Sequence, residues 1–141
     1  MSKSFHLEII TPQKVVFNGE VADFAAPGVV GGFEILSNHA DFISAMTIGE
    51  IRVREEDGYD DYFATSGGYV DVHDNKVTVL AETCEKASDI DIHRAKEEHE
   101  KALKRMEDRA SIDPEQVRLA LLRAQNRIEI ASKRLKNSHG S

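Results

Sequence analysis

The hydrophobic period of the chain changes after Cys84, and this change limits the folds that the sequence can adopt. In residues 1–82, apolar and polar residues alternate in short runs, as in FHLEII, where Phe5, Leu7 and Ile9 share one face. Turn-forming pairs such as Asn-Gly and Asp-Gly separate the runs. Short strands with frequent turns predict a two-layer antiparallel β-sandwich.

One stretch of this region has the pattern of a β-hairpin. In YVDVHDNKVTVLAE, valines alternate with polar residues on both sides of an Asp-Asn pair. We expect residues 70–72 to pair with residues 77–79 across a turn at 74–75. The stretch LSNHADFISAMT, residues 36–47, fits a loop and a short strand.

After Cys84 the apolar residues recur at intervals of three, four or seven, which is the spacing of an α-helix. Asp91, with Ser88 three residues before it, predicts the start of a helix over 91–109 through a variant of the capping box. The pattern breaks at residues 109–113.

A second helix is predicted over 114–136. Asp113 is a suitable N-cap, and Pro114 fits the first helical turn. The residues expected where the two helices face each other are Ile92, Ala95, Ala102, Met106, Ala110, Val117, Ala120, Ala124, Ile128, Ala131 and Leu135. The predicted fold class is therefore α+β by segments: an N-terminal antiparallel β-sandwich, the β-body (residues 1–86), and a C-terminal antiparallel two-helix hairpin, the arm (residues 87–141).

The seam between the predicted helices is rich in alanine. Alanine lets helices approach closely but buries little apolar surface, so the packing of the hairpin is expected to be marginal. Each helix by itself contains many good helix formers. The arm could therefore stay helical while its packing opens, as a conformational switch requires.

Charge is divided unevenly between the two parts. Residues 1–86 contain six Lys or Arg and fifteen Asp or Glu, whereas residues 87–141 contain twelve and ten, and seven of the nine arginines. The net charge of −7 argues against nucleic acid as a partner, because phosphate backbones need a basic surface. An arginine-rich arm suits an acidic protein surface or a nucleotide.

The sequence contains no recognisable catalytic motif. The glycines of APGVVGGF lack the Gly-Lys-Ser/Thr of a P-loop, and no G-x-S-x-G elbow is present. His93 and His99 are six residues apart on one helix, which does not suit a zinc pair. The single cysteine cannot form an internal disulfide and fits a reducing compartment. No apolar run approaches the ~18 residues of a membrane span, and no secretory signal is evident.

Three arginines, Arg123, Arg127 and Arg134, follow one side of the second helix beside the alanine seam. Two interpretations are open. They could form ordinary ion pairs with carboxylates near the first helix, each worth about 0–1 kcal/mol when exposed. Alternatively, Arg123 and Arg127 could join Arg94 in a site for a polyanion.

The ordered motifs over nearly the whole chain resemble the ε subunit of bacterial F-type ATP synthase. The resemblance is carried by HLEIITP, VFNGEV, APGVVGGFEILSNHA, GEIRV, FATSGGYVDV, NKVTVLAE and finally IDIHRA, which matches the family's I/L-D-x-x-R-A element. Each motif is weak by itself, but their order is specific.

The resemblance implies a non-catalytic rotor subunit that couples proton-driven rotation to ATP synthesis. In this family the sandwich binds the γ subunit and sits on the c-subunit ring, and Glu34 and His39 occupy the part that meets the ring. The arm can extend toward the α/β catalytic subunits and inhibit ATP hydrolysis, with Arg123, Arg127 and Arg134 facing an acidic segment of β. The implied location is peripheral, on the cytoplasmic face of the bacterial inner membrane.

Some members of the family bind a regulatory ATP in the folded hairpin without hydrolysing it; no cofactor is required otherwise. The residues that match their site by position are Glu85, Asp91, Arg94, Ala95, Arg123 and Arg127. Lys101 and Gln116 stand where such members have arginines. Lysine loses the bidentate fork and glutamine loses the charge, so we expect ATP binding to be weak or lost.

A second function class also fits the pattern. A free-standing β-sandwich adaptor with a coiled-coil arm would have the same two parts and no active site. Binding to γ discriminates between the two, since the adaptor would not bind it. An enzyme would need a clustered nucleophile and base, and the sequence offers neither.

Overall fold

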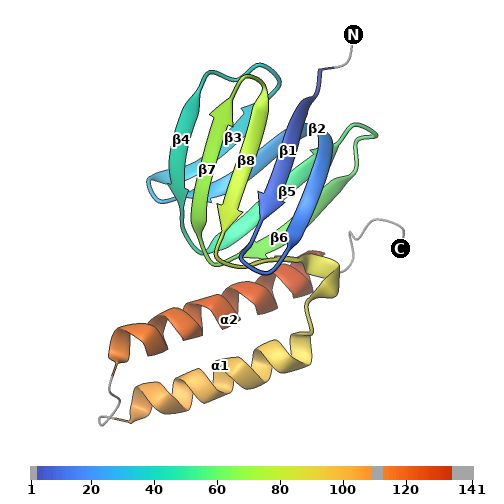
Figure 1. The fold of residues 1–141 in the computed structure, drawn as a ribbon. Coiled ribbons are helices and arrows are strands. Elements are labelled where there is room, and N and C mark those ends of the chain that lie inside the picture. Colours follow the sequence, from blue (N-terminus) through green and yellow to red (C-terminus); the bar gives the residue numbers. More distant parts are fainter. Residues whose placement is uncertain (1–2, 109–112, 135–141) are drawn as a thin grey trace.

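The computed structural model describes residues 3–108 and 113–134. Nine strands precede the helices: β1 (Phe5–Ile10), β2 (Val15–Gly28), β3 (Gly31–Leu36), β4 (Phe42–Met46), β5 (Gly49–Glu55), β6 (Asp60–Thr65), β7 (Gly68–His73), β8 (Lys76–Ala81) and β9 (Cys84–Lys86). A 3-10 turn (Ala87–Asp89), α1 (Ile92–Glu107) and α2 (Pro114–Arg134) follow. The β-sandwich and the two-helix arm that the sequence predicts are both confirmed (Figure 1).

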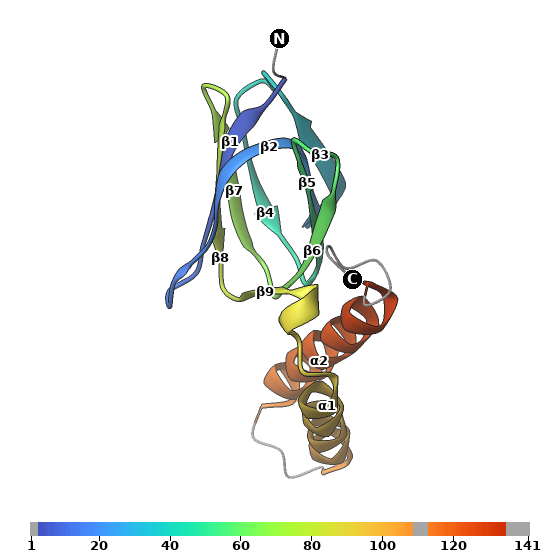
Figure 2. The same ribbon diagram turned by 90° about the vertical axis from the view of Figure 1, so that its right-hand side faces the viewer.

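The strands form two layers that β2 joins. One layer contains β1, β8, β7 and β4, and the other contains β3, β2, β5, β6 and β9. β2 is long enough to pair with β1 at its start and with β5 and β3 further along, so it crosses from one layer to the other (Figure 2). One pair departs from the expected antiparallel pattern, because β1 lies parallel to β8.

The core of the β-body lies between the two layers. Phe5, Leu7 and Ile9 alternate with partly exposed residues along β1 and are at most 1% exposed, as the sequence predicts. Phe24 of β2 and Ile35 of β3 fill the same core from the other layer. This alternation fixes the strand register, since a slip by one residue would turn every core side chain toward solvent.

The predicted hairpin is confirmed in β7 and β8. Val70 pairs with Val79 and Val72 with Val77. Asp74 and Asn75 both have positive φ, 49° and 59°, which is the requirement of a type I′ turn.

The two helix caps are specified by aspartates. The Asp91 carboxylate accepts a hydrogen bond from the Arg94 backbone nitrogen (3.1 Å) and caps α1. Asp113 accepts one from the Gln116 backbone nitrogen (3.2 Å) at the start of α2. The prediction that Ser88 takes part in the cap of α1 is wrong, because Ser88 lies in the 3-10 turn that precedes this helix.

The seam between α1 and α2 is made of small side chains. Four of the predicted seam residues are buried there: Ala95, Ala102, Val117 and Ala124. Ala131 is also buried, but it belongs to the contact with the β-body. Met106 was also expected there but is 50% exposed, because the buried positions of α1 are seven residues apart and Met106 falls in the last turn. Ala110 and Leu135 lie outside the described residues.

The second helix has two packing partners. α2 lies between α1 and the β-body in both views (Figures 1 and 2). Its contact with the β-body contains a small buried cluster of Ala64, Ala87, Ile90, Ile130 and Ala131. Ile130 faces this second partner and is therefore buried, whereas Ile128, expected in the seam, is only partly buried. Within the described residues, neither helix combines the length and apolar character needed to cross a membrane.

We expect replacement of Gly68 by alanine to destabilise the β-body. Gly68 has φ +144°, and an added Cβ would overlap the carbonyl oxygen of Leu80 on the neighbouring strand. The free energy of unfolding should fall by about 3 kcal/mol. Chemical denaturation followed by circular dichroism measures this change.

Gly19→Ala is the matched control. Its added Cβ would meet only ring carbons of Phe17 at 3.7 Å, an ordinary contact. Equal stability losses in the two variants would show that the backbone at residue 68 is not constrained in this way.

Candidate functional site

A cleft of about 620 Å³ lies beside the contact between the arm and the β-body and is lined by both. On the body side it is lined by the hydroxyl-bearing Thr65, Ser66 and Thr83, and on the other side by residues of α1 and α2. The Thr83 hydroxyl donates to that of Ser66 (2.7 Å), and the Thr65 hydroxyl donates to the Thr83 carbonyl (2.9 Å). The body wall thus combines these hydroxyl groups with two charged residues, Lys14 and Glu85, and the helices supply the remaining charges.

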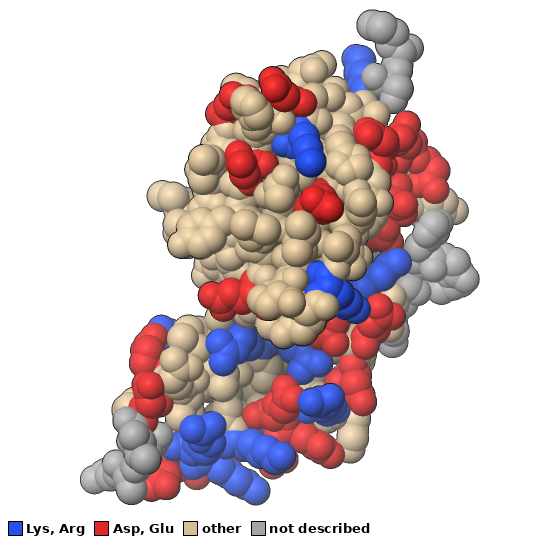
Figure 3. Space-filling view, viewed as in Figure 1, with Lys and Arg blue, Asp and Glu red and all other residues tan. Residues whose placement is uncertain are grey.

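Cations outnumber carboxylates around this cleft. The basic lining residues are Lys14, Lys101, Arg105, Arg123 and Arg127. The acidic ones are Glu85 and Glu98. Figure 3 shows Lys and Arg side chains gathered on the arm and at its junction with the β-body, interleaved with carboxylates. The excess of positive charge makes the cleft suitable for an anion.

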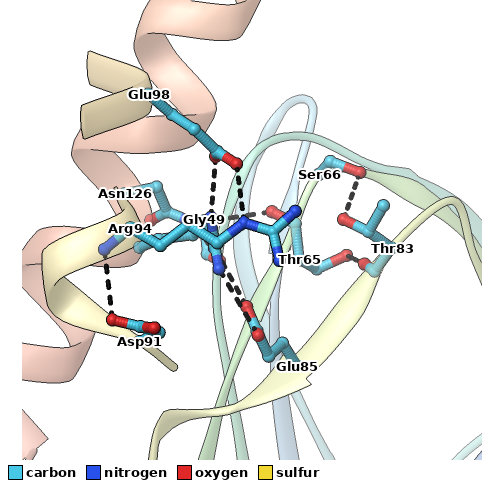
Figure 4. A network of polar contacts seen from close by, with 10 residues as sticks. Gly49, Thr65, Ser66, Thr83, Glu85, Asp91, Arg94, Glu98 and Asn126 are labelled. Carbon is cyan, nitrogen blue, oxygen red and sulfur yellow. Dashed lines mark hydrogen bonds and ion pairs between the residues drawn. The ribbon is translucent and has the colours of Figure 1, made fainter. Parts of the chain in front are cut away.

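One arginine joins the three elements around the cleft. Arg127 of α2 donates from Nε and Nη2 to the Glu85 carboxylate of β9 (2.9 and 3.4 Å) and from Nη1 to Glu98 of α1 (2.9 Å). Glu98 also accepts from Arg94 Nε (3.3 Å). Figure 4 shows this group, with Arg94 close to Glu98 and Glu85 nearer to the β-body. The Arg127 side chain is 22% exposed, so this network is better shielded from water than a typical surface ion pair.

The six residues predicted for nucleotide binding are only partly brought together. Glu85, Arg123 and Arg127 line the cleft. Asp91 instead caps α1, and the Arg94 side chain is 72% exposed and pairs with Glu98. Ala95 is fully buried in the seam. The ion-pair interpretation is confirmed for Arg127 and Arg134. Arg123 forms no ion pair among the described residues, and the polyanion site stays a prediction.

The two positions that depart from the family's nucleotide site lie in different surroundings. Lys101 lines the cleft and can supply a point charge to a ligand there. Gln116 is exposed in the first turn of α2 and is not part of the lining.

Sequence reasoning missed three charged residues of the cleft. Glu98 lies four residues after Arg94, so the i,i+4 spacing could have identified it. Arg105 lies one turn after Lys101 on the same side of α1. Lys14 comes from the β1–β2 loop, and no local pattern connects that loop to the arm.

A second ionic contact holds the end of α2 to the β-body. Arg134 donates from Nη2 and Nε to the Glu50 carboxylate (2.7 and 2.9 Å), and its guanidinium lies 3.7 Å from the centre of the Tyr62 ring. The hydrogen bond to Glu50 raises the pKa of Arg134. Nearby, the Asn126 amide donates to the Gly49 carbonyl (2.9 Å). We call Glu50, Tyr62 and Arg134 the latch.

The residues expected to meet the c-ring lie on different elements. Glu34 is in β3, where its carboxylate accepts from Arg52 Nη2 (2.7 Å). Hydrogen bonds with the Asp23 carboxyl and with Arg52 lower the pKa of Glu34. His39 is in the β3–β4 loop, where its Nδ1 lies 2.8 Å from the Ala40 carbonyl oxygen. Their contact with a ring stays a prediction.

Comparison with known proteins agrees with this architecture. The family model for the ATP synthase delta/epsilon chain β-sandwich domain matches residues 4–87, and the one for the long α-helix domain of that chain matches residues 88–132. An ATP synthase epsilon chain from Syntrophomonas wolfei is 41% identical over 133 residues, covering 94% of this chain and 97% of the relative. The epsilon chain of Nitratidesulfovibrio vulgaris strain DP4 is 41% identical over 131 residues, covering 92% and 97%.

Two solved assemblies contain chains with a similar fold. A chain in the mitochondrial ATP synthase of Euglena gracilis superposes with a TM-score of 0.78 at 19% identity, covering 89% of this chain and 80% of that one. A chain in the central stalk and c-ring assembly of Tetrahymena thermophila gives 0.55 at 15% identity, covering 91% and 93%. The sequence relatives and both family models show that this chain belongs to the family of ATP synthase epsilon chains.

Proposed function

We propose that the chain is a non-catalytic rotor subunit of a bacterial F-type ATP synthase, with a β-body that docks in the central stalk and an arm that regulates ATP hydrolysis. The observation that carries this proposal is a contrast between the packing inside the β-body and the packing of the arm against it. A continuous apolar core holds the β-body together, whereas small side chains and arginine–carboxylate pairs hold the arm to it.

The outer face of the β-body offers a surface for the γ subunit. Ile43, Tyr69 and Leu80 are 75%, 61% and 55% exposed, and they lie on the adjacent strands β4, β7 and β8. Tyr69 is paired directly with Leu80. Exposed apolar side chains on neighbouring strands are typical of a protein interface. The end of the β-body with the His39 loop would face the c-ring.

The arm supplies the regulatory part of the proposal. In the folded state Arg127 and Arg134 are bound to carboxylates of the same chain. Extension of the arm toward the α/β subunits would free both arginines for an acidic segment of β and so block rotation in the direction of hydrolysis. Such charge pairs would contribute steering and register more than net affinity.

The cleft supports weak binding of ATP as a regulatory ligand. Lys101 and Arg123 are available for phosphates, since neither forms an ion pair within the described part of the chain. Arg127, in contrast, is already neutralised by Glu85 and Glu98. ATP bound there would stabilise the folded arm, by ~2.7 kcal/mol at a concentration 100 times its dissociation constant.

The same proposal implies where the chain is located and what part it has in ATP synthesis. As part of the assembled synthase, the chain would be peripheral to the cytoplasmic face of the inner membrane. It would couple proton-driven rotation to ATP synthesis without binding a reacting group itself.

Deletion of residues 88–141 should relieve inhibition of ATP hydrolysis. The β-body keeps its own core, so it should still fold and dock on γ. In a synthase assembled with the truncated chain, we expect the ATPase rate to rise several-fold while proton-coupled ATP synthesis is retained. Both rates can be measured in membrane vesicles. An ATPase rate equal to that of the full-length assembly would contradict an inhibitory arm.

Titration of the isolated chain with ATP tests the nucleotide site. We expect weak binding that Arg123→Ala reduces at least tenfold, because Arg123 lines the cleft and forms no ion pair with a carboxylate in residues 3–108 and 113–134. Isothermal titration calorimetry measures the affinity. Arg118→Ala is the control, since Arg118 is exposed on the same helix and pairs with Glu115. If wild type, Arg123→Ala and Arg118→Ala respond equally, the cleft is not the nucleotide site.

A further inference from the structure

Arg127 and Arg134 hold carboxylates of the β-body in the same way. Each presents Nε and one terminal nitrogen to both oxygens of a single glutamate, Glu85 for Arg127 and Glu50 for Arg134. This bidentate geometry is the strongest and most selective that arginine forms with carboxylates. The two arginines are seven residues apart, so their Cα atoms are spaced by ~10 Å along α2.

We propose that Glu50 and Glu85 are internal competitors for the arginine face of α2, and that they occupy the nitrogens with which the arm would bind an acidic partner. This inference rests on the proposed function of the arm. The partner that it implies is an acidic protein segment with two carboxylates about 10 Å apart. The arm cannot bind such a segment and the β-body at the same time, because both would use the same guanidinium nitrogens.

The latch is the stronger of the two competing contacts. The side chains of Arg134 and Glu50 are 17% and 25% exposed, compared with 22% and 36% for Arg127 and Glu85. The Tyr62 ring covers one face of the Arg134 guanidinium, which adds a cation–π contact. Arg134 is also the last residue of α2, so the latch holds the helix at the end farthest from the turn between the helices.

The location of Glu50 makes the competition testable. Glu50 belongs to β5 and not to the arm, so a substitution there leaves the arginine face intact. A residue that merely supported the arm would weaken its function when removed. A competitor has the opposite effect, because its removal frees Arg134 for the partner.

The first measurement uses the isolated full-length chain. Glu50→Gln keeps the shape of the side chain and removes its charge. We expect amide hydrogen exchange in α2 to become about tenfold faster, while exchange in β1 and β7 is unchanged. Glu8→Gln is the matched control: Glu8 is also a carboxylate on a strand of the β-body, and no ion pair joins it to the described residues. Equal amide exchange rates in α2 of the two variants would overturn the inference that Glu50 holds this helix to the β-body.

A charge reversal guards against an indirect effect of the substitution on folding. Glu50→Arg should accelerate exchange in α2, and Glu50→Arg combined with Arg134→Glu should slow it again. Failure of the double variant to recover, with the β-body still protected, would also count against a direct pair.

The second measurement uses the assembled synthase. Glu50→Gln should lower the ATPase rate severalfold, because the arm is released toward its partner, and Glu8→Gln should not. Faster exchange in α2 without a change in the ATPase rate, in an assembly where arm deletion still activates hydrolysis, would overturn the competition. Failure of arm deletion to activate hydrolysis would instead contradict the proposed inhibitory function. The exchange data would then still show whether Glu50 holds α2 to the β-body.

Discussion

The contact between the arm and the β-body is the interaction on which the behaviour of this chain depends. Its apolar part, within the described residues, is a cluster of five buried side chains, and three of these are alanines. Burial of an alanine contributes far less than burial of a leucine or phenylalanine. Bidentate pairs therefore supply much of the contact, through Arg127 with Glu85 and Arg134 with Glu50. Because such pairs are weakened by salt and can be replaced by other carboxylates, the contact suits reversible release.

The proposed regulation by the arm requires this division of interactions between the two parts of the chain. The β-body is closed by β2, which pairs in both layers, and its core contains the large apolar side chains of the molecule. The arm contains good helix formers with sound caps at Asp91 and Asp113. Each part can therefore keep its secondary structure when the two separate, and only the arginine pairs and the small cluster must be broken.

The sequence predicts well whatever depends on local pattern. Alternation identified the buried residues of β1, and the Asp74-Asn75 turn gave the β7–β8 pairing. It predicts poorly whatever depends on long-range placement. The parallel pairing of β1 with β8 and the Arg134–Glu50 pair join residues about 70 and 84 positions apart, which no local period reveals. Met106 was misplaced because helical period alone does not say where a packed seam ends.

Hydrogen exchange of the native chain at increasing denaturant concentration shows whether the arm opens independently of the β-body. We expect amides of α1 and α2 to exchange through a local opening. Its free energy should lie well below that of global unfolding and depend little on denaturant, while amides of β1, β7 and β8 stay protected. If the amides of the helices and the core strands instead shared one free energy and one denaturant dependence, the arm and the β-body would unfold as a single unit, and a detachable regulatory arm would be contradicted.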